Sequence, residues 1–94
     1  MIHFLNYFMP LDLEKAHIMF KLARKGNWGA KYDRLEHFKR FQNLEEIIKN
    51  LLRINWIFFY KKPNYKAISL NQKYKAEIIE FIESQMPYVK GMIR

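Results

Sequence analysis

Residues 43–70, NLEEIIKNLLRINWIFFYKKPNYKAISL, decide the fold, because they predict one helix followed directly by one β-hairpin. Apolar residues recur at helical spacing from residue 44 to residue 54. The buried face of this helix is predicted to consist of Leu44, Ile47, Ile48, Leu51 and Leu52. Asn43 precedes the helix as a predicted N-cap, and Glu46 is placed to complete a capping box with it. Asn55 follows and can adopt the left-handed conformation that ends a helix.

The second half of the stretch predicts the hairpin. Residues 56–60, WIFFY, are aromatic and β-branched, which suits a strand better than a helix. Residues 62–65, KPNY, predict a turn, because Pro63 presets φ at the second turn position. Residues 65–70 are the predicted partner strand. One face of this strand would carry Tyr65, Ala67 and Ser69, and the other Lys66, Ile68 and Leu70.

The composition indicates a single globular domain. The chain has 94 residues, half of them hydrophobic, which is enough for one modest core. It contains no cysteine, so disulfides and thiolate metal sites are excluded. No apolar run approaches the roughly 20 residues of a membrane-spanning helix, and residues 1–9 lack the basic flank of a signal peptide. We therefore expect a cytoplasmic protein with no membrane contact.

The formal net charge of +8 is concentrated in two blocks. Residues 21–40 contain seven basic and two acidic side chains, and residues 61–75 contain five lysines and no acid. A positive potential of this size favours a polyanionic partner such as nucleic acid or an anionic membrane. The alternative is a basic protein that its charge simply keeps soluble.

A first helix is predicted over residues 13–25, with Asp12 as its N-cap and Gly26 at its end. The residues expected to face inward are Leu13, Ala16, Met19, Phe20 and Ala23. Residues 27–32 are a candidate short strand beside the hairpin.

Two more capped helices are predicted. Asp33 and Glu36 form a capping box that opens a short second helix, residues 33–40. Together with the helix that follows, this pattern is typical of a helix-turn-helix. Asn71 is the predicted cap of a last helix, residues 72–86, which a proline closes.

The two ends of the chain flank the predicted domain, residues 12–86. Residues 1–11 form an apolar N-terminal extension, strand or helix, that would cover the core or contact another subunit. The last helix carries a wide apolar band, so we expect a homodimer through this helix and the extension. Residues 87–94 are predicted to form a loose tail.

This order of elements resembles the small winged helix-turn-helix transcriptional regulators of prokaryotes, many of them archaeal. Residues 51–57, LLRINWI, resemble the helix end that enters the wing, with Asn55 where the family usually has Gly. Residues 68–74, ISLNQKY, resemble the strand-to-helix step written Leu-Thr-Glu-Lys-Gly in many members. Asn71 stands in place of the Thr and Tyr74 in place of the Gly. The resemblance implies an α+β, mostly helical winged helix-turn-helix, with a three-helix core, a β-hairpin wing and a C-terminal helix.

The resemblance also implies double-stranded DNA as the partner, with the third helix in the major groove and the wing on the backbone. Phosphate contacts supply affinity and register, and base edges supply specificity. The predicted DNA-binding residues are Lys31, Arg34, Lys39, Arg40, Gln42, Lys49, Asn50, Arg53, Lys61, Lys62 and Lys66. Glu45 and Glu46 depart from this picture, because acids near a polyanion favour weak binding or a winged helix that contacts protein.

We find no pattern that indicates an enzyme, a cofactor or a metal site. The histidines His3, His17 and His37 lack ligand spacing, and the three glycines are too scattered for a phosphate-binding loop. The functions to compare are therefore DNA binding in transcription by a cytoplasmic, nucleoid-associated protein, protein contact inside a replication or transcription assembly, and RNA binding.

Overall fold

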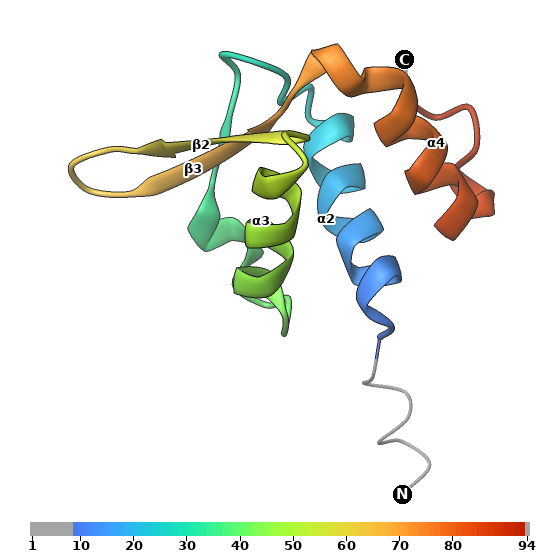
Figure 1. Cartoon of the computed structure of the whole chain (residues 1–94), viewed down its shortest axis with the longest axis horizontal. Helices are drawn as coiled ribbons and strands as arrows, with labels where there is room; N and C mark the ends of the chain where they lie inside the picture. The colour runs from blue at the N-terminus through green and yellow to red at the C-terminus, as the bar shows by residue number, and fades with distance from the viewer. Residues whose placement is uncertain (1–8, 94) are drawn as a thin grey trace, which may run out of the picture.

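The computed structural model describes residues 9–93, and over these residues the chain has an α+β fold with three α-helices and one three-stranded antiparallel sheet (Figure 1). The helices are α2 (Leu11–Arg24), α3 (Leu44–Arg53) and α4 (Lys75–Gln85). The strands are β1 (Asp33–Arg34), β2 (Ile57–Lys61) and β3 (Lys66–Leu70). Short 3-10 turns are η1 (Leu35–Phe38), η2 (Gln72–Tyr74) and η3 (Pro87–Val89). The α+β class and the predicted hairpin are confirmed, whereas most of the predicted N-terminal extension lies outside the described residues.

The sheet has the strand order β1-β3-β2, so β3 is its central strand. Residues 67–70 of β3 are buried on both faces of the sheet. The helices α2 and α3 pack against one face, and on the other face the carbonyl oxygen of Gly29 accepts a hydrogen bond from Ser69 Oγ at 2.7 Å. The predicted strand over residues 27–32 is wrong, because this segment makes only an isolated bridge from Trp28 to Leu70.

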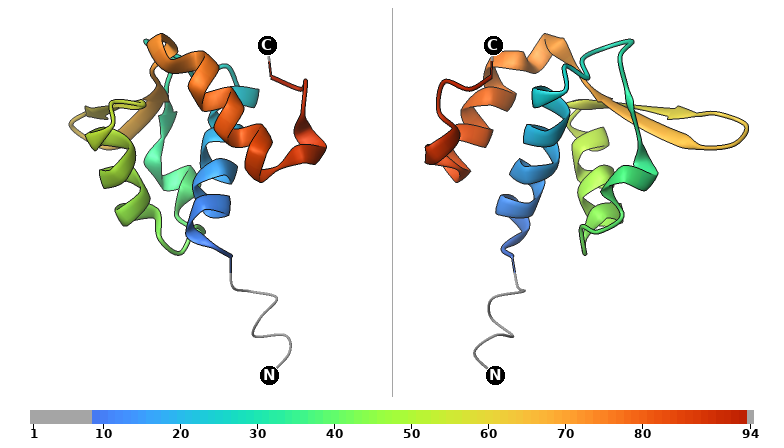
Figure 2. Two further views of the ribbon diagram at one scale, coloured as in Figure 1. Left: turned by 45° about the vertical axis from the view of Figure 1, so that its right-hand side comes forward. Right: turned by 180° about the vertical axis from the view of Figure 1, so that it is seen from behind.

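Helix α2 lies between α3 and α4 and forms the centre of the core (Figure 2). It begins at Leu11 after Pro10, without a side-chain cap, so the predicted Asp12 cap is wrong. Gly26 follows the helix at φ +72°, as its end signal predicted. The core of the described residues includes Ala16, Ile18, Met19, Leu22, Phe38, Ile47, Leu51, Ile68, Leu70, Ile78 and Ile82.

The start of α3 is held by a carboxylate from α2. Glu14 is only 3 % exposed, and its two oxygens accept hydrogen bonds from the backbone N and the side-chain Nδ2 of Asn43, both at 2.9 Å. Asn43 occupies the N-cap position but makes no side-chain cap bond. The predicted capping box with Glu46 is therefore wrong, because Glu14 already accepts from the Asn43 amide.

The second predicted helix is a short 3-10 turn, η1. Its N-cap is Arg34, and Asp33 belongs to β1, where it lies opposite Ile68. Pairing with the central strand outweighs the local capping signal of Asp33 and Glu36, because the pairing also places Phe38 in the core at 0 % exposure.

The residues that flank the hairpin behave as predicted, whereas the C-terminal tail does not. Asn55 adopts φ +62° after α3, and the side chain of Asn71 accepts from the backbone N of Lys73. The tail is packed rather than loose, because Val89 is 3 % exposed and Ile93 packs on the core. None of the helices over residues 9–93 combines the length and apolar character that crossing a membrane requires.

Candidate functional site

The hairpin projects beyond the helices and carries exposed lysines at its tip (Figure 1). The turn closes with a hydrogen bond from Lys62 N to the carbonyl oxygen of Tyr65 at 2.8 Å. Lys61 and Lys66 lie directly opposite one another at the end of the ribbon. Like charges in this position repel, and within residues 9–93 no carboxylate forms an ion pair with either lysine. The tip therefore has a positive charge that the described chain does not compensate.

The exposed side of α3 carries both signs of charge. Lys49 and Arg53 are exposed, and neither forms an ion pair with another described residue. Glu45 and Glu46 are exposed in the first turn, where acids favour the helix start. Asn50 is directed toward α2, since its Oδ1 accepts a hydrogen bond from Lys15 Nζ at 2.8 Å.

An apolar groove of about 320 Å³ lies between α3, η1 and the hairpin. Its lining residues are Leu35, Leu44, Glu45, Ile48, Lys49, Leu52, Phe59 and Lys66. A neighbouring hollow shares Leu35, Leu44 and Lys66 and adds Glu36, Lys39 and Tyr65. The structure thus brings Lys39, Lys49 and Lys66 around one concave surface. Leu52 is 37 % exposed in the groove, so its predicted place in the core is wrong.

Two other predicted cations lie on the sheet face turned away from α3. The guanidinium carbon of Arg34 is 4.2 Å from the ring centroid of Tyr65. Lys62 Nζ is 5.5 Å from the ring centroid of Tyr32 and 5.7 Å from that of Tyr60. We call this set, with the neighbouring Phe58, the outer sheet face: Tyr32, Arg34, Phe58, Tyr60, Lys62 and Tyr65. The predicted site did not include the tyrosines. The signal that could have found them was the alternation of side chains along the strands, which placed Tyr65 on the face opposite to Lys66.

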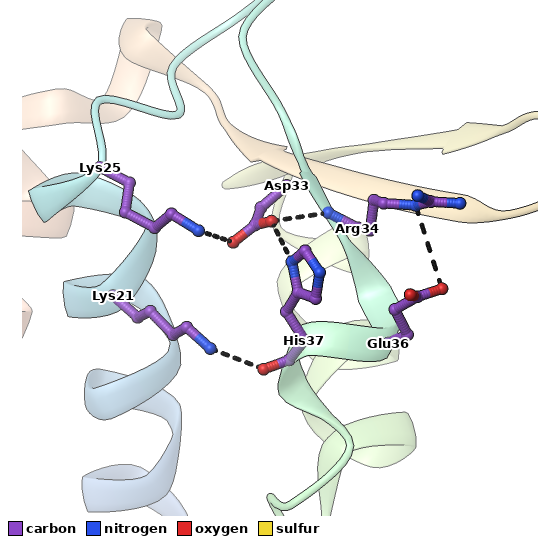
Figure 3. A network of polar contacts seen from close by, with 6 residues as sticks. All are labelled: Lys21, Lys25, Asp33, Arg34, Glu36 and His37. Atoms are coloured by element: carbon purple, nitrogen blue, oxygen red, sulfur yellow. Dashed lines mark hydrogen bonds and ion pairs between the residues drawn. The ribbon is translucent and has the colours of Figure 1, made fainter.

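The base of the site is fixed by the carboxylate of Asp33, which is 6 % exposed (Figure 3). Its Oδ2 accepts from Lys25 Nζ at 2.8 Å, and its Oδ1 lies 2.6 Å from His37 Nδ1 and 2.9 Å from Arg34 N. Burial alone raises the pKa of the Asp33 carboxyl, but the hydrogen bonds from Lys25, His37 and the Arg34 amide outweigh it and hold that pKa below its ordinary value. Lys21 Nζ adds a hydrogen bond to the His37 carbonyl oxygen at 2.6 Å, so α2, β1 and η1 are tied together.

The remaining predicted residues lie elsewhere. Arg40 and Gln42 line a separate cavity of about 330 Å³ with Glu14 and His17. Burial, assisted by the positive charge of Arg40, lowers the pKa of His17. Lys31 is exposed in the loop that leads to β1.

Among residues 9–93 there is no group of three or more His, Asp or Glu side chains arranged to hold a metal ion. Comparison of the chain with protein-family models, with curated proteins and with solved structures found no match. The functional argument therefore depends on the geometry and charge described above.

Proposed function

We propose that the protein binds double-stranded DNA as a winged helix regulator of transcription, with α3 in the major groove and the hairpin as a wing on the backbone. The order α2, β1, η1, α3 and the β2–β3 hairpin is compatible with that fold. The observation that carries the proposal is the uncompensated pair Lys61 and Lys66 at the hairpin tip. A phosphate backbone supplies the negative charge that this pair lacks, and local conflicts of this kind are expected at functional sites.

The proposed roles follow from position. Lys49 and Arg53 approach the DNA from α3, and Lys39 and Lys66 flank them across the groove. Phosphate contacts from these cations provide affinity and register, not sequence information. Glu45 in the first turn of α3 can accept from a cytosine amino group. The two acids at this position limit affinity. Because the proposed contacts are between cations and phosphates, we expect binding that is strongly dependent on salt.

A homodimer in the nucleoid is part of the proposal. Ile79 and Ala76 on α4 line an open hollow whose other lining residues are Glu80, Glu83, Ser84 and Lys90. The two apolar side chains offer a contact to a second copy. In a dimer of this class, the two reading helices lie about 34 Å apart and match half-sites one helical turn apart.

One observation favours a second function, contact with a protein in a replication or transcription assembly. The groove beside α3 is lined mainly by apolar side chains, among them Leu35, Leu52 and Phe59. Exposed apolar surface of this kind is typical of a protein interface. The two functions can be distinguished with duplex DNA, because only the first function requires the protein to bind it.

The experiment that tests the proposal is fluorescence anisotropy with a labelled random duplex across a potassium chloride series. We expect the logarithm of the affinity to fall linearly with the logarithm of salt, with a slope worth several phosphates. Lys61→Ala should weaken the binding of all duplex sequences alike and reduce the slope of the salt dependence by about 1. Lys73→Ala, which removes an exposed lysine from η2 and lies outside the groove and the hollow of α4, is the matched control and should change neither quantity. Absence of binding at low salt would overturn the DNA proposal and favour protein contact.

A further inference from the structure

The outer sheet face is an aromatic surface without an acid of its own. The ring centroids of Tyr32 and Tyr60 are 5.1 Å apart, and those of Tyr32 and Tyr65 are 6.4 Å apart. Phe58 lies two positions before Tyr60 on β2, on the same face, and is 39 % exposed. Four aromatic rings are thus gathered on one side of a three-stranded sheet.

The charge around these rings is positive. Arg34 and Lys62 lie over the tyrosine rings, and strands β2 and β3 contain no carboxylate. The acid of β1, Asp33, is turned to the opposite side, where it pairs with Lys25. Glu36 of η1 is 3.9 Å from Arg34 Nε and is itself exposed, so this contact is weak in water.

Rings and cations in this arrangement suit a nucleic acid whose bases are not paired. In a duplex the base planes are hidden in the stack, whereas a single strand offers them to aromatic side chains. A guanidinium group can stack on a base or bind a phosphate, so Arg34 can leave the Tyr65 ring for either contact. We propose that the outer sheet face binds single-stranded nucleic acid, with bases stacked on Tyr60, Tyr65 and Phe58 and phosphates held by Arg34 and Lys62.

Phe58, Tyr60 and Lys62 lie on the side of the ribbon turned away from α3 and do not line the groove beside it, whereas Tyr65 also borders the hollow that contains Lys39. The part of the outer sheet face around Phe58 is therefore distinct from the proposed duplex site. The inference therefore does not depend on duplex binding by α3. If both sites exist, one molecule can hold a duplex and an adjacent single strand, as at the edge of a melted region.

The test is anisotropy with a labelled oligothymidine strand, an abasic strand of equal length and a duplex, all at one salt concentration. We expect oligothymidine to bind at least about fivefold more tightly than the abasic strand, since stacking requires the base. Phe58→Leu should weaken oligothymidine binding at least about fivefold and leave duplex binding unchanged, because Phe58 does not line the groove beside α3. Phe58→Tyr, which keeps the ring, should bind like the natural chain.

Tyr88→Leu is the matched control, because Tyr88 is an aromatic residue on the tail that is 71 % exposed. It should bind both nucleic acids as the natural chain does. Equal affinity for oligothymidine and the abasic strand would overturn the inference, as would a Phe58→Leu variant whose oligothymidine binding is unchanged. A loss shared equally by single strand and duplex would show one common surface and would also overturn it. Circular dichroism of each variant establishes that it is folded.

Discussion

At the scale of single residues, the contact between Glu14 and Asn43 joins α2 to the start of α3. The carboxylate is almost fully buried, and both of its oxygens accept from one residue at the start of α3. Glu14→Gln keeps the shape of the side chain but replaces one carboxylate oxygen with an NH₂ group. This group would face an N–H donor of Asn43. We expect a loss of about 1–3 kcal/mol in the free energy of unfolding, measured by urea denaturation. Glu77→Gln, on the exposed face of α4, should stay within about 0.5 kcal/mol of the natural chain, and an equally mild Glu14→Gln would contradict this role.

Asp33 provides a pH-dependent contribution to stability. Its carboxyl has a folded pKa below the ordinary value of 3.8, so the unfolded chain binds the proton more tightly than the folded chain does. The stabilisation is complete above pH 3.8 and is lost as pH falls through the folded pKa. We expect Asp33→Asn to unfold at lower urea concentration than the natural chain at neutral pH, with the difference shrinking toward about pH 2. A difference that stays constant over this range would show that the ionised form contributes nothing.

Hydrogen bonds to buried carboxylates, such as those of Glu14 and Asp33, are hard to predict from sequence. Glu14 and Asn43 are 29 positions apart, and nothing in either local pattern indicates that they meet. Asn43 was correctly placed at the helix start because its residue type is a common cap, but the atom that satisfies it comes from another helix. Local signals predict where an element begins, and tertiary contacts decide which group binds there.

At the scale of elements, the hairpin tip combines a structural cost with a proposed function. Lys61 lies opposite Lys66, and opposite-charge pairs in such positions stabilise by about 0.2–1 kcal/mol. Lys61→Glu should therefore raise the free energy of unfolding by a few tenths of a kcal/mol. The same change should weaken duplex binding more than Lys61→Ala does, because it adds repulsion from phosphate. Higher stability with unchanged duplex affinity would remove the hairpin tip from the DNA interface.

The junction between α3 and β2 depends on the left-handed conformation of Asn55, at φ +62°. Glycine adopts this conformation without the clash that a Cβ atom creates. We expect Asn55→Gly to be neutral or stabilising, and Asn55→Ala to lower the free energy of unfolding by about 1 kcal/mol. Urea denaturation of both variants measures the difference. If the two variants were equally stable, the junction would not require positive φ in solution.

The elements that the sequence predicts well are those whose signals are local. The α3 helix has apolar spacing, the hairpin has β-branched residues around a proline turn, and both are present. The second helix and the short strand were misplaced, because Asp33 pairs with Ile68 on a distant strand instead of capping a helix. The central position of β3 could not be predicted either, since strand order is a property of the sheet.

At the scale of the whole molecule, the predicted cations separate into distinct surfaces. Lys39, Lys49 and Lys66 surround the groove beside α3, whereas Arg34 and Lys62 belong to the outer sheet face. A charge count along the chain cannot separate them, because neighbouring residues of a strand point to opposite faces. Lys61 lies opposite Lys66, whereas Lys62, the next residue in sequence, lies over the rings of Tyr32 and Tyr60.

The last prediction concerns the association of two whole molecules. The tail residues Val89 and Ile93 pack on the core beside α4, so only part of the apolar band, including Ile79, remains for a second copy. We expect a reversible homodimer in sedimentation equilibrium, and Ile79→Glu should shift it to monomer because a charge would be buried in the contact. Glu77→Gln, at an exposed position of α4 that does not line this hollow, should leave the dimer intact. On a duplex with two half-sites one turn apart, Ile79→Glu should bind more weakly than the natural chain, whereas a single half-site should bind both equally. A natural chain that sediments as a monomer at every concentration would refute this dimer, and the wing and α3 would then have to bind DNA as a single copy.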